Sequence, residues 1–288
     1  MPRIGATLAL VWLLSCLPVQ PVSAQPDAAR VTASLTAIAA GDNTAARRQA
    51  IITHLRGLGV EPAMEPFGEG RMVGENIVVT LQGSGASRTI VIGAHYDRVN
   101  VGRGAVDNGA ACAALIELVA AFKTAPLQRS TLQVVFFDRE ENGLFGSRAF
   151  FRDGRRVDYA VNMDVFAYGD SIFATTSHPN GALLKWLRTS GDAIGLPVRD
   201  VPRNSYPASD HITMMAAGIE TLGVALVDMS DVDGILAIGE QGLKPGRGPR
   251  ILRIIHTPDD TMAEVRADQV VRGIEVVERL IRTVDSEP

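Results

Sequence analysis

The sequence predicts an α/β fold: a three-layer α/β/α sandwich around a mixed, largely parallel central sheet. The main observation is that strand-length apolar runs alternate with helix-length segments, which is typical of a sheet covered by helices. The second observation is the composition, since 46% of the 288 residues are hydrophobic and 21% are charged. That balance provides one large core, and we predict a single domain over residues 25–288.

The expected elements follow in chain order. Residues 25–60 are predicted to be helical, with a break at 41–43 and an end near 57–59. Strands are predicted at 76–81, 89–94, 131–137, 160–164 and 221–227. Further helices are predicted at 108–123, 143–151, 181–191 and 267–284. Residues 229–250, rich in Gly and Asp, are the one long segment predicted to be irregular.

Residues 1–24 have the pattern of a secretory signal peptide. Arg3 precedes a short apolar run at 6–17, and Val22 and Ala24 occupy positions −3 and −1 of a cleavage site. A transmembrane anchor is less favoured because the run is short for a bilayer span, and lipoprotein attachment at Cys16 is a further alternative. Cleavage leaves Cys112 as the one cysteine, which excludes an intrachain disulfide. We therefore expect an exported protein, periplasmic or secreted.

The charge of the chain argues against two classes of partner. The formal net charge is −4, and no run of Lys and Arg is present, so the electrostatic footprint of nucleic-acid binding is missing. The one stretch suited to a membrane lies at the very start of the chain. We expect no contact with nucleic acid, and none with a membrane once the signal peptide is removed.

Polar motifs follow predicted strands or precede predicted helices. They are G-A-H-Y-D at 93–97, A-V-D-N-G at 105–109 and F-F-D-R-E-E at 136–141. Each alone fits a turn, a helix N-cap or a solvated first turn of a helix. Together they place nitrogen and oxygen ligands at one edge of the sheet, where an open α/β fold has its active site. Zinc accepts this ligand set, and of two adjacent glutamates one can bind metal while the other transfers protons.

Six motifs in this order resemble the co-catalytic zinc aminopeptidases of the bacterial leucyl aminopeptidase type, which are relatives of glutaminyl cyclases. The motifs are G-A-H-Y-D, A-V-D-N-G, F-F-D-x-E-E-x-G-L-x-G-S, N-x-D, S-D-H and I-H-T-P-x-D-T. The similarity runs from about Asn76 to the end of the chain. It implies a zinc-dependent exopeptidase that hydrolyses the N-terminal bond of peptides with a free N-terminus, through a hydroxide bridging two zinc ions.

The resemblance also implies which residues bind the two zinc ions per chain. Asp107 would bridge them, His95 and Asp164 would complete one, and Glu141 and His256 would complete the other. Charge counting agrees with this set, because three carboxylates and one bridging hydroxide neutralise two Zn²⁺ ions. Without metal the same carboxylates would repel one another in a cleft of low dielectric constant.

Three residues receive catalytic roles from the resemblance. Glu140 would be the general base. Asp97 would hold the imidazole of His95 by its free ring nitrogen. Tyr206 would hydrogen-bond the substrate carbonyl oxygen. The alternative interpretation is that Tyr206 is an ordinary half-buried loop residue with no catalytic role. Since the ligand set is already complete, the S-D-H motif at 209–211 is expected to be structural or to face the substrate.

Three other functions remain open. A glutaminyl-peptide cyclase shares the fold, but the resemblance implies a tryptophan-rich pocket, and the mature chain retains only Trp186. A compact carboxypeptidase would need a cation for the substrate carboxylate, which Arg203 can supply. A metal-stabilised binding module would have no use for the spare carboxylate of Glu140.

Overall fold

The computed structural model describes residues 25–68, 72–152, 154–201, 208–241 and 248–288. The predicted signal peptide with Cys16, and the segment with Arg203 and Tyr206, lie outside the described residues. The predictions on these residues stay predictions.

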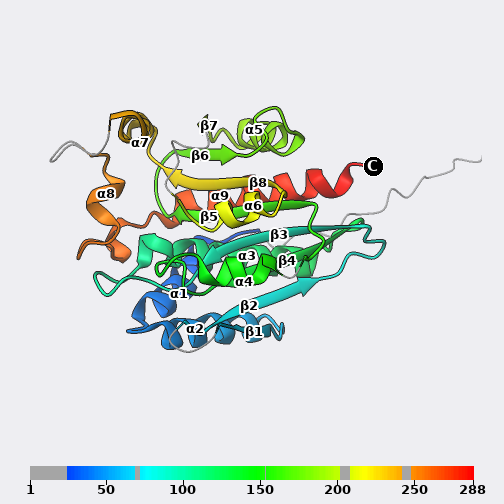
Figure 1. Ribbon diagram of the computed structural model, residues 1–288, viewed down its shortest axis with the longest axis horizontal. Helices are drawn as coiled ribbons and strands as arrows, with labels where there is room; N and C mark the ends of the chain where they lie inside the picture. Colours follow the sequence, from blue (N-terminus) through cyan, green and yellow to red (C-terminus); the bar gives the residue numbers. More distant parts are fainter. Residues whose placement is uncertain (1–24, 69–71, 153, 202–207, 242–247) are drawn as a thin grey trace, which may run out of the picture.

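Within the described residues, eight strands form one mixed sheet in the order β1-β2-β4-β3-β5-β8-β6-β7 (Figure 1). The strands are β1 Ala63–Phe67, β2 Gly74–Leu81, β3 Arg88–His95, β4 Ser130–Phe137, β5 Tyr159–Phe166, β6 Ser171–Thr176, β7 Val198–Val201 and β8 Glu220–Val227. The central neighbours β4, β3, β5 and β8 are parallel, whereas β2 and β6 join them antiparallel. The carboxyl ends of the four parallel strands therefore meet at one edge of the sheet, where α/β folds bind ligands.

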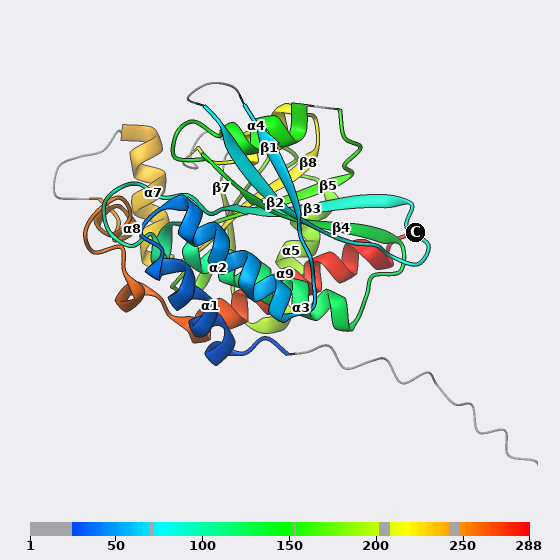
Figure 2. The ribbon, with the colours of Figure 1, turned by 90° about the horizontal axis from the view of Figure 1, so that it is seen from below.

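Helices cover both faces of this sheet, as Figure 2 shows for α1, α2, α3 and α9 on one side and α4 on the other. The helices on the first face are α1 Ala28–Ala40, α2 Thr44–Gly57, α3 Ala110–Thr124, α5 Ala182–Ile194 and α9 Ala267–Ser286. Those on the second face are α4 Phe145–Arg152 and α6 His211–Ala216. The remaining helical segments are η1 Ala105–Gly109, α7 Met229–Gln241, α8 Ile251–Ile254 and η3 Met262–Glu264. The predicted three-layer α/β/α sandwich is confirmed.

The two faces bury cores of different size. The larger core lies under α1, α3 and α9, and α3 is its central helix. The segment Ala105–Thr124 is long and apolar enough to cross a membrane, but 94% of its most apolar window is buried inside the protein, as in a core helix. The smaller core under α4 and α6 centres on Phe137, Phe150 and Met214. Asp27 and Asn43 cap α1 and α2, as expected for residues that accept hydrogen bonds from free helical N–H groups.

The prediction of an irregular segment at 229–250 was wrong, because most of it forms α7. Val232 and Ile235, three residues apart, are 1% and 7% exposed, so they lie on one helix face that packs on the core. This burial outweighs the poor helix propensity of the Gly and Asp residues. Strands β1, β6 and β7 were not predicted, whereas the other five strands and the main helices lie within a few residues of their predicted ranges.

Candidate metal centre

Five predicted metal ligands meet at the carboxyl edge of the parallel strands. His95 is the last residue of β3, and Asp164 lies near the end of β5. Glu141 follows β4, Asp107 lies in η1 ahead of α3, and His256 follows α8. Residues separated by more than 150 positions in sequence therefore contribute to one cluster, because parallel strands end at the same edge of the sheet.

The carboxylate of Asp107 stands between two groups of ligands. Its Oδ1 lies 3.1 Å from His95 Nε2, which is 3.5 Å from Asp164 Oδ1. Its Oδ2 lies 3.2 Å from His256 Nε2, which is 3.1 Å from Glu141 Oε2. The five side chains that the resemblance implies as metal ligands thus lie in two groups that share Asp107.

These distances fit the edges of a metal coordination polyhedron. Zinc ligands at about 2.0–2.2 Å in a tetrahedron are separated from one another by roughly 3.3–3.6 Å. Ligand atoms of His95, Asp107 and Glu141 all lie within 4.8 Å of one another. Glu141 Oε1 and Asp164 Oδ1 are buried and have no hydrogen-bond partner among the described residues. Buried carboxylate oxygens without donors are costly, so this donor set suits divalent cations.

The electrostatics of the cluster show the same need for positive charge. Burial raises the pKa of Glu140 to about 9, with His95 opposing the shift and Asp164 adding to it. Burial also raises the pKa of Glu141 to about 7. Hydrogen bonding to Asp107 raises the pKa of His256 to about 9. Without metal, bound protons therefore neutralise part of the negative charge of the cluster, and a bound metal would displace them.

Glu140 lies beside the ligand groups but takes part in none of the ion pairs that define them. Arg139 before it has a φ of 62°, a left-handed conformation that turns the chain sharply after β4. The Arg139 guanidinium donates to Val73 O and Asn142 Oδ1 and so is bonded to neither Glu140 nor a predicted metal ligand. A second constraint is Gly146, where a Cβ atom would lie only 2.3 Å from Asp138 O, so α4 can begin close to β4.

Asp97 lies beside His95 Nδ1 and also makes contacts that were not predicted. His95 Nδ1 lies 3.3 Å from Asp97 O and 3.5 Å from its Oδ1. The carboxylate accepts hydrogen bonds from the backbone N–H groups of Glu140 at 3.0 Å and Glu141 at 3.2 Å. Asp97 is 3% exposed and so connects the imidazole ligand to the glutamate pair. The motif G-A-H-Y-D gave no signal for this second contact.

Two buried residues anchor the segment that leads to Asp107. Asp260 accepts hydrogen bonds from Val106 N at 2.7 Å and Asp107 N at 3.3 Å. Arg47, from α2, is fully buried and donates to three carbonyl oxygens, those of Tyr96, Arg103 and Gly104, at 2.6, 3.0 and 3.0 Å. The sequence placed Asp260 in a polar motif, but nothing distinguished Arg47 from its exposed neighbours.

Two ligands lie next to or at strained backbone positions. Val165, directly after Asp164, has a φ of 53°, and His256 has a φ of 59°. A left-handed conformation is unfavourable for a β-branched residue such as Val165, and it coincides with an irregularity in the β5–β8 pairing after Met163. This irregularity separates Asp164 from the regular ladder.

The S-D-H motif is buried, with Ser209, Asp210 and His211 all at most 1% exposed. Asn162, on β5, donates to Ser209 Oγ at 3.1 Å. Burial, opposed by the charge of His95, raises the pKa of Asp210 to about 7. The charge of Asp210 in turn contributes to the raised pKa of Glu140. This placement is compatible with the structural reading of the motif.

Comparison with known proteins assigns the family. Residues 76–281 match peptidase family M28, and the chain belongs to this family. A probable leucine aminopeptidase from Arthroderma benhamiae is 24% identical over 195 residues, which cover 62% of this chain and 49% of that protein. The chain spans half or less of the length of such curated relatives. Membership of this family supports a metal-dependent peptidase and confirms the suspected resemblance.

Solved structures share the fold at low sequence identity. LapB from Legionella pneumophila gives a TM-score of 0.74 at 19% identity, covering 91% of this chain and 73% of that chain. A zinc aminopeptidase from Bacillus subtilis gives a TM-score of 0.61 at 19% identity, and the match covers 74% of this chain and 51% of that chain. Glutaminyl cyclase from Porphyromonas gingivalis gives a TM-score of 0.72 at 16% identity, and the match covers 90% of this chain and 98% of that chain. The fold is thus common to aminopeptidases and cyclases and does not choose between them.

Proposed function

We propose that this protein is a two-zinc aminopeptidase, which removes the N-terminal residue of peptides. The observation that carries the proposal is the Asp107 carboxylate, which faces one ligand group with each oxygen while Glu140 remains outside both groups. A structural metal site uses all its ligands to hold the ion and needs no spare base, so this arrangement favours catalysis over a metal-stabilised binding module.

The donor set would hold one ion through His95 and Asp164, the other through Glu141 and His256, and both through Asp107. Zinc ions bound there supply a Lewis acid and lower the pKa of water. Glu140 takes the proton from the attacking water and returns it to the leaving amine. Asp97 holds the backbone of Glu140 and Glu141, which fixes the base beside the metal ligands.

Charge around the site favours a substrate amine over a substrate carboxylate. Asp164 is 15% exposed and Glu141 is 9% exposed, so carboxylates reach the open side of the cluster. The nearest motif arginine, Arg139, is bonded away from the site. With Asp107, Glu141 and Asp164 neutralised by two Zn²⁺ ions and a hydroxide, the carboxylate of Glu140 leaves the site with a net negative charge. This charge favours a free α-amino group and supports cleavage from the amino end.

The cyclase alternative has less support. In the described structure Trp186 lies on α5 and packs edge-on against Tyr159, with ring centroids 6.0 Å apart. That contact belongs to the core of the first face and not to the metal ligands. The tryptophan-rich pocket that the resemblance implies for cyclases therefore has no counterpart in Trp186.

The experiment compares free, N-acetylated and C-amidated forms of one leucyl peptide. We expect cleavage of the free and amidated forms, a much lower kcat/KM for the acetylated form, and loss of all activity with a chelator. Cleavage of the acetylated form with loss on amidation would assign the protein to carboxypeptidases, and release of ammonia from an N-terminal glutamine peptide would assign it to cyclases.

We further propose that residues 1–24 direct export and are removed. The motif pattern described above supports this proposal. Mass spectrometry of protein from the periplasm or medium should give a chain that begins at Gln25. A mature mass that retains residues 1–24, or a lipid on Cys16, would contradict it.

A further inference from the structure

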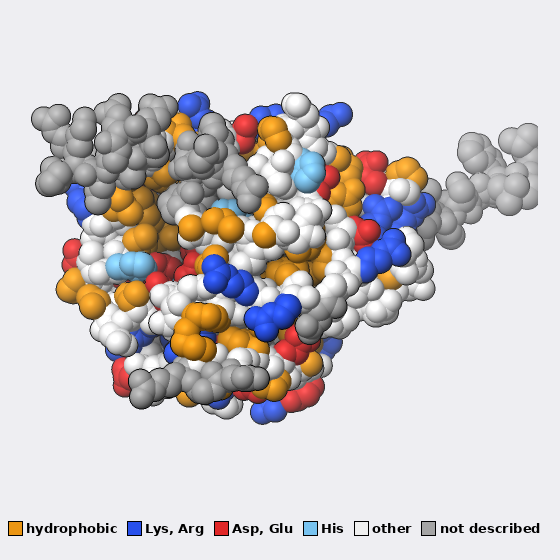
Figure 3. Space-filling view, in the orientation of Figure 1, with side chains coloured by type: hydrophobic (Ala, Val, Ile, Leu, Met, Phe, Trp, Pro, Cys, Tyr) orange, Lys and Arg blue, Asp and Glu red, His pale blue; other side chains and the backbone are white. Residues whose placement is uncertain are grey.

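A groove of about 360 Å³ runs between α4 and α6 on the second face of the sheet. Its apolar lining includes Leu144, Phe151, Ile212 and Ala216, and its charged lining residues are Arg148 and Arg152. In the orientation of Figure 1, Figure 3 shows Lys or Arg side chains beside hydrophobic ones on the surface over α4. The groove thus combines an apolar floor with a basic rim.

Both walls of the groove are hydrogen-bonded to motifs of the metal centre. Leu144 N donates to Glu140 O at 2.9 Å, so the groove wall is bonded to the residue that carries the proposed base. On the opposite wall, Thr213 donates through both N and Oγ1 to Asp210 O, at 3.1 and 2.7 Å. An extended peptide advances about 3.3 Å per residue. Residues a few positions beyond a bond held at the metal centre can therefore reach this groove.

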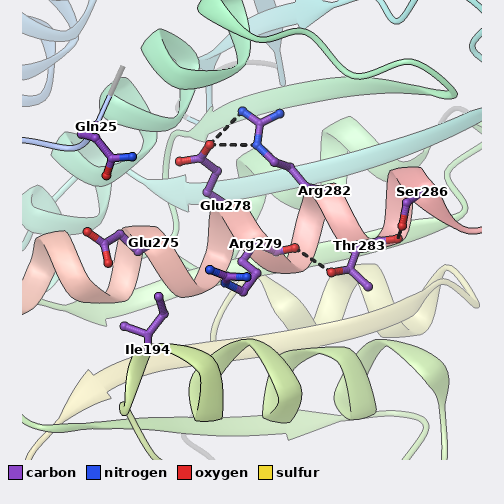
Figure 4. Close-up of a pocket in the computed structure, with 8 residues that line it drawn as sticks. All are labelled: Gln25, Ile194, Glu275, Glu278, Arg279, Arg282, Thr283 and Ser286. Atoms are coloured by element: carbon purple, nitrogen blue, oxygen red, sulfur yellow. Dashed lines mark hydrogen bonds and ion pairs between the residues drawn. The ribbon is translucent and has the colours of Figure 1, made fainter. Parts of the chain in front are cut away.

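The two arginines have no ion-pair partner within the described structure, since Glu65, which lines a second pocket with Arg152, pairs with Arg155. Both side chains are exposed, and neither forms a hydrogen bond or an ion pair with a described residue. The groove along α9 in Figure 4 is different, since Arg282 Nε there donates to Glu278 Oε1 at 2.9 Å and lies over the Phe122 ring. Unpaired guanidinium groups over an apolar floor fit a ligand with carboxylate and apolar side chains.

We propose that the groove between α4 and α6 is the subsite for the downstream part of a peptide substrate, with Arg148 and Arg152 selecting an acidic residue there. The proposal rests on the proposed aminopeptidase function. It adds that the enzyme discriminates peptides by charge several residues beyond the cleaved bond, which the metal centre alone cannot do. The direct bonding of both groove walls to the site motifs favours a substrate tail over an unrelated partner protein.

The test uses C-amidated leucyl hexapeptides that are identical except for Glu, Gln or Lys at one of positions two to five. An exposed ion pair contributes about 0.2–1 kcal/mol, which corresponds to roughly 1.5- to 5-fold, so two pairs give about 2- to 25-fold. We expect the kcat/KM of the Glu peptide to exceed that of the Lys peptide by this factor at one or two positions. The factor should decrease in 0.5 M salt, because salt screens exposed charges.

The double variant Arg148→Glu with Arg152→Glu should abolish or invert the ratio. Arg156→Glu is the matched control, because this side chain is 82% exposed and does not line the groove. It should retain the wild-type ratio and the wild-type rate on leucine p-nitroanilide, which has no downstream residues. Equal rates for Glu and Lys peptides at every position, or an unchanged ratio in the double variant, would overturn the subsite while leaving the aminopeptidase intact. A wild-type protein inactive on leucine p-nitroanilide and on every peptide would instead overturn the proposed function itself.

Discussion

The two ligand groups that share Asp107 are built on different supports. His95 and Asp164 come from adjacent parallel strands in the middle of the sheet and are 1% and 15% exposed. His256 follows the short helix α8 and is 53% exposed. Sites built on rigid elements hold their ligands more closely than sites built on loops. For the two metals proposed above, we therefore expect a tightly held inner ion at His95 and a more exchangeable outer ion at His256.

The anchors of the two groups differ in the same way. The chain after His95 is held by the buried Arg47, which donates to Tyr96 O, and the backbone of the shared Asp107 is held by Asp260, which accepts hydrogen bonds from Val106 N and Asp107 N. The chain on either side of His256 is held by Arg250, whose guanidinium pairs with Asp228 at 3.1 Å and Glu264 at 2.7 Å. All three of these charged side chains are at least 28% exposed, so water and salt reach them.

The largest effect should come from the shared ligand. Asp107→Ala removes one ligand from each group, so we expect both metals to be lost and turnover to fall by at least about 10³-fold, as when a catalytic unit is removed entirely. Elemental analysis measures the metal content, and a leucine p-nitroanilide assay measures turnover. A variant that keeps one tightly bound metal together with substantial activity would show that Asp107 does not bridge.

The next effect distinguishes the two groups directly. His256→Ala should lower the occupancy of one position and retain close to one metal per chain. His95→Ala should reduce both, because His95 also lies within a buried network and its loss leaves a cavity. Thermal unfolding is the second readout, with a clear decrease for His95→Ala and little change for His256→Ala. Equal metal loss in the two variants would remove the distinction between inner and outer positions.

A smaller effect is expected at the anchor of the shared residue Asp107. Asp260→Ala leaves the N–H groups of Val106 and Asp107 without their acceptor, and outer-shell partners of this kind alter metal affinity by about 10–100-fold. Competition with a chromophoric chelator measures the affinity. An affinity within twofold of the wild type would mean that the backbone at Asp107 is held by other contacts.

The smallest effect belongs to the outer anchor. Arg250→Met keeps much of the apolar stem but removes ion pairs that are partly exposed, which contribute about 0–1 kcal/mol. We expect a decrease of that size in unfolding free energy at low salt and almost none in 0.5 M salt. A large decrease that persists in high salt would show that the outer group is as firmly supported as the inner one.

The sequence was sufficient for the parts of the fold that repeat a strong local pattern. Strand β3 and helix α3 are continuous apolar segments, and the ligand motifs stand at their ends, so both elements and ligands were predicted. Strand β6 is fully buried, yet it contains Ser171, Thr175 and Thr176 and lacks the apolar run that the prediction requires. Strand β7 has only four residues at the edge of the sheet. Tertiary burial, not local preference, determines these elements.

Contacts between distant segments were the other limit. Arg47 reads as one more basic residue on a surface helix, and only the folded chain shows its burial beneath Tyr96 and Gly104. The second role of Asp97 has the same origin, because strand order brings β3 and β4 together only in the sheet. The division of ligands into two groups was predicted through the resemblance, and the geometry around Asp107 agrees with it.

The separation of metal binding from proton transfer is the central claim, and the pair Glu140→Gln and Glu141→Gln tests it most directly. The metal content and kcat of both purified variants are measured beside the wild type. Glu140 lies outside both ligand groups, so Glu140→Gln should keep two metals per chain and lose about 10²–10⁴-fold in kcat, the usual contribution of a general base. Glu141→Gln should lose metal as well as activity. Release of metal from Glu140→Gln, or a near-normal rate in that variant, would contradict the account.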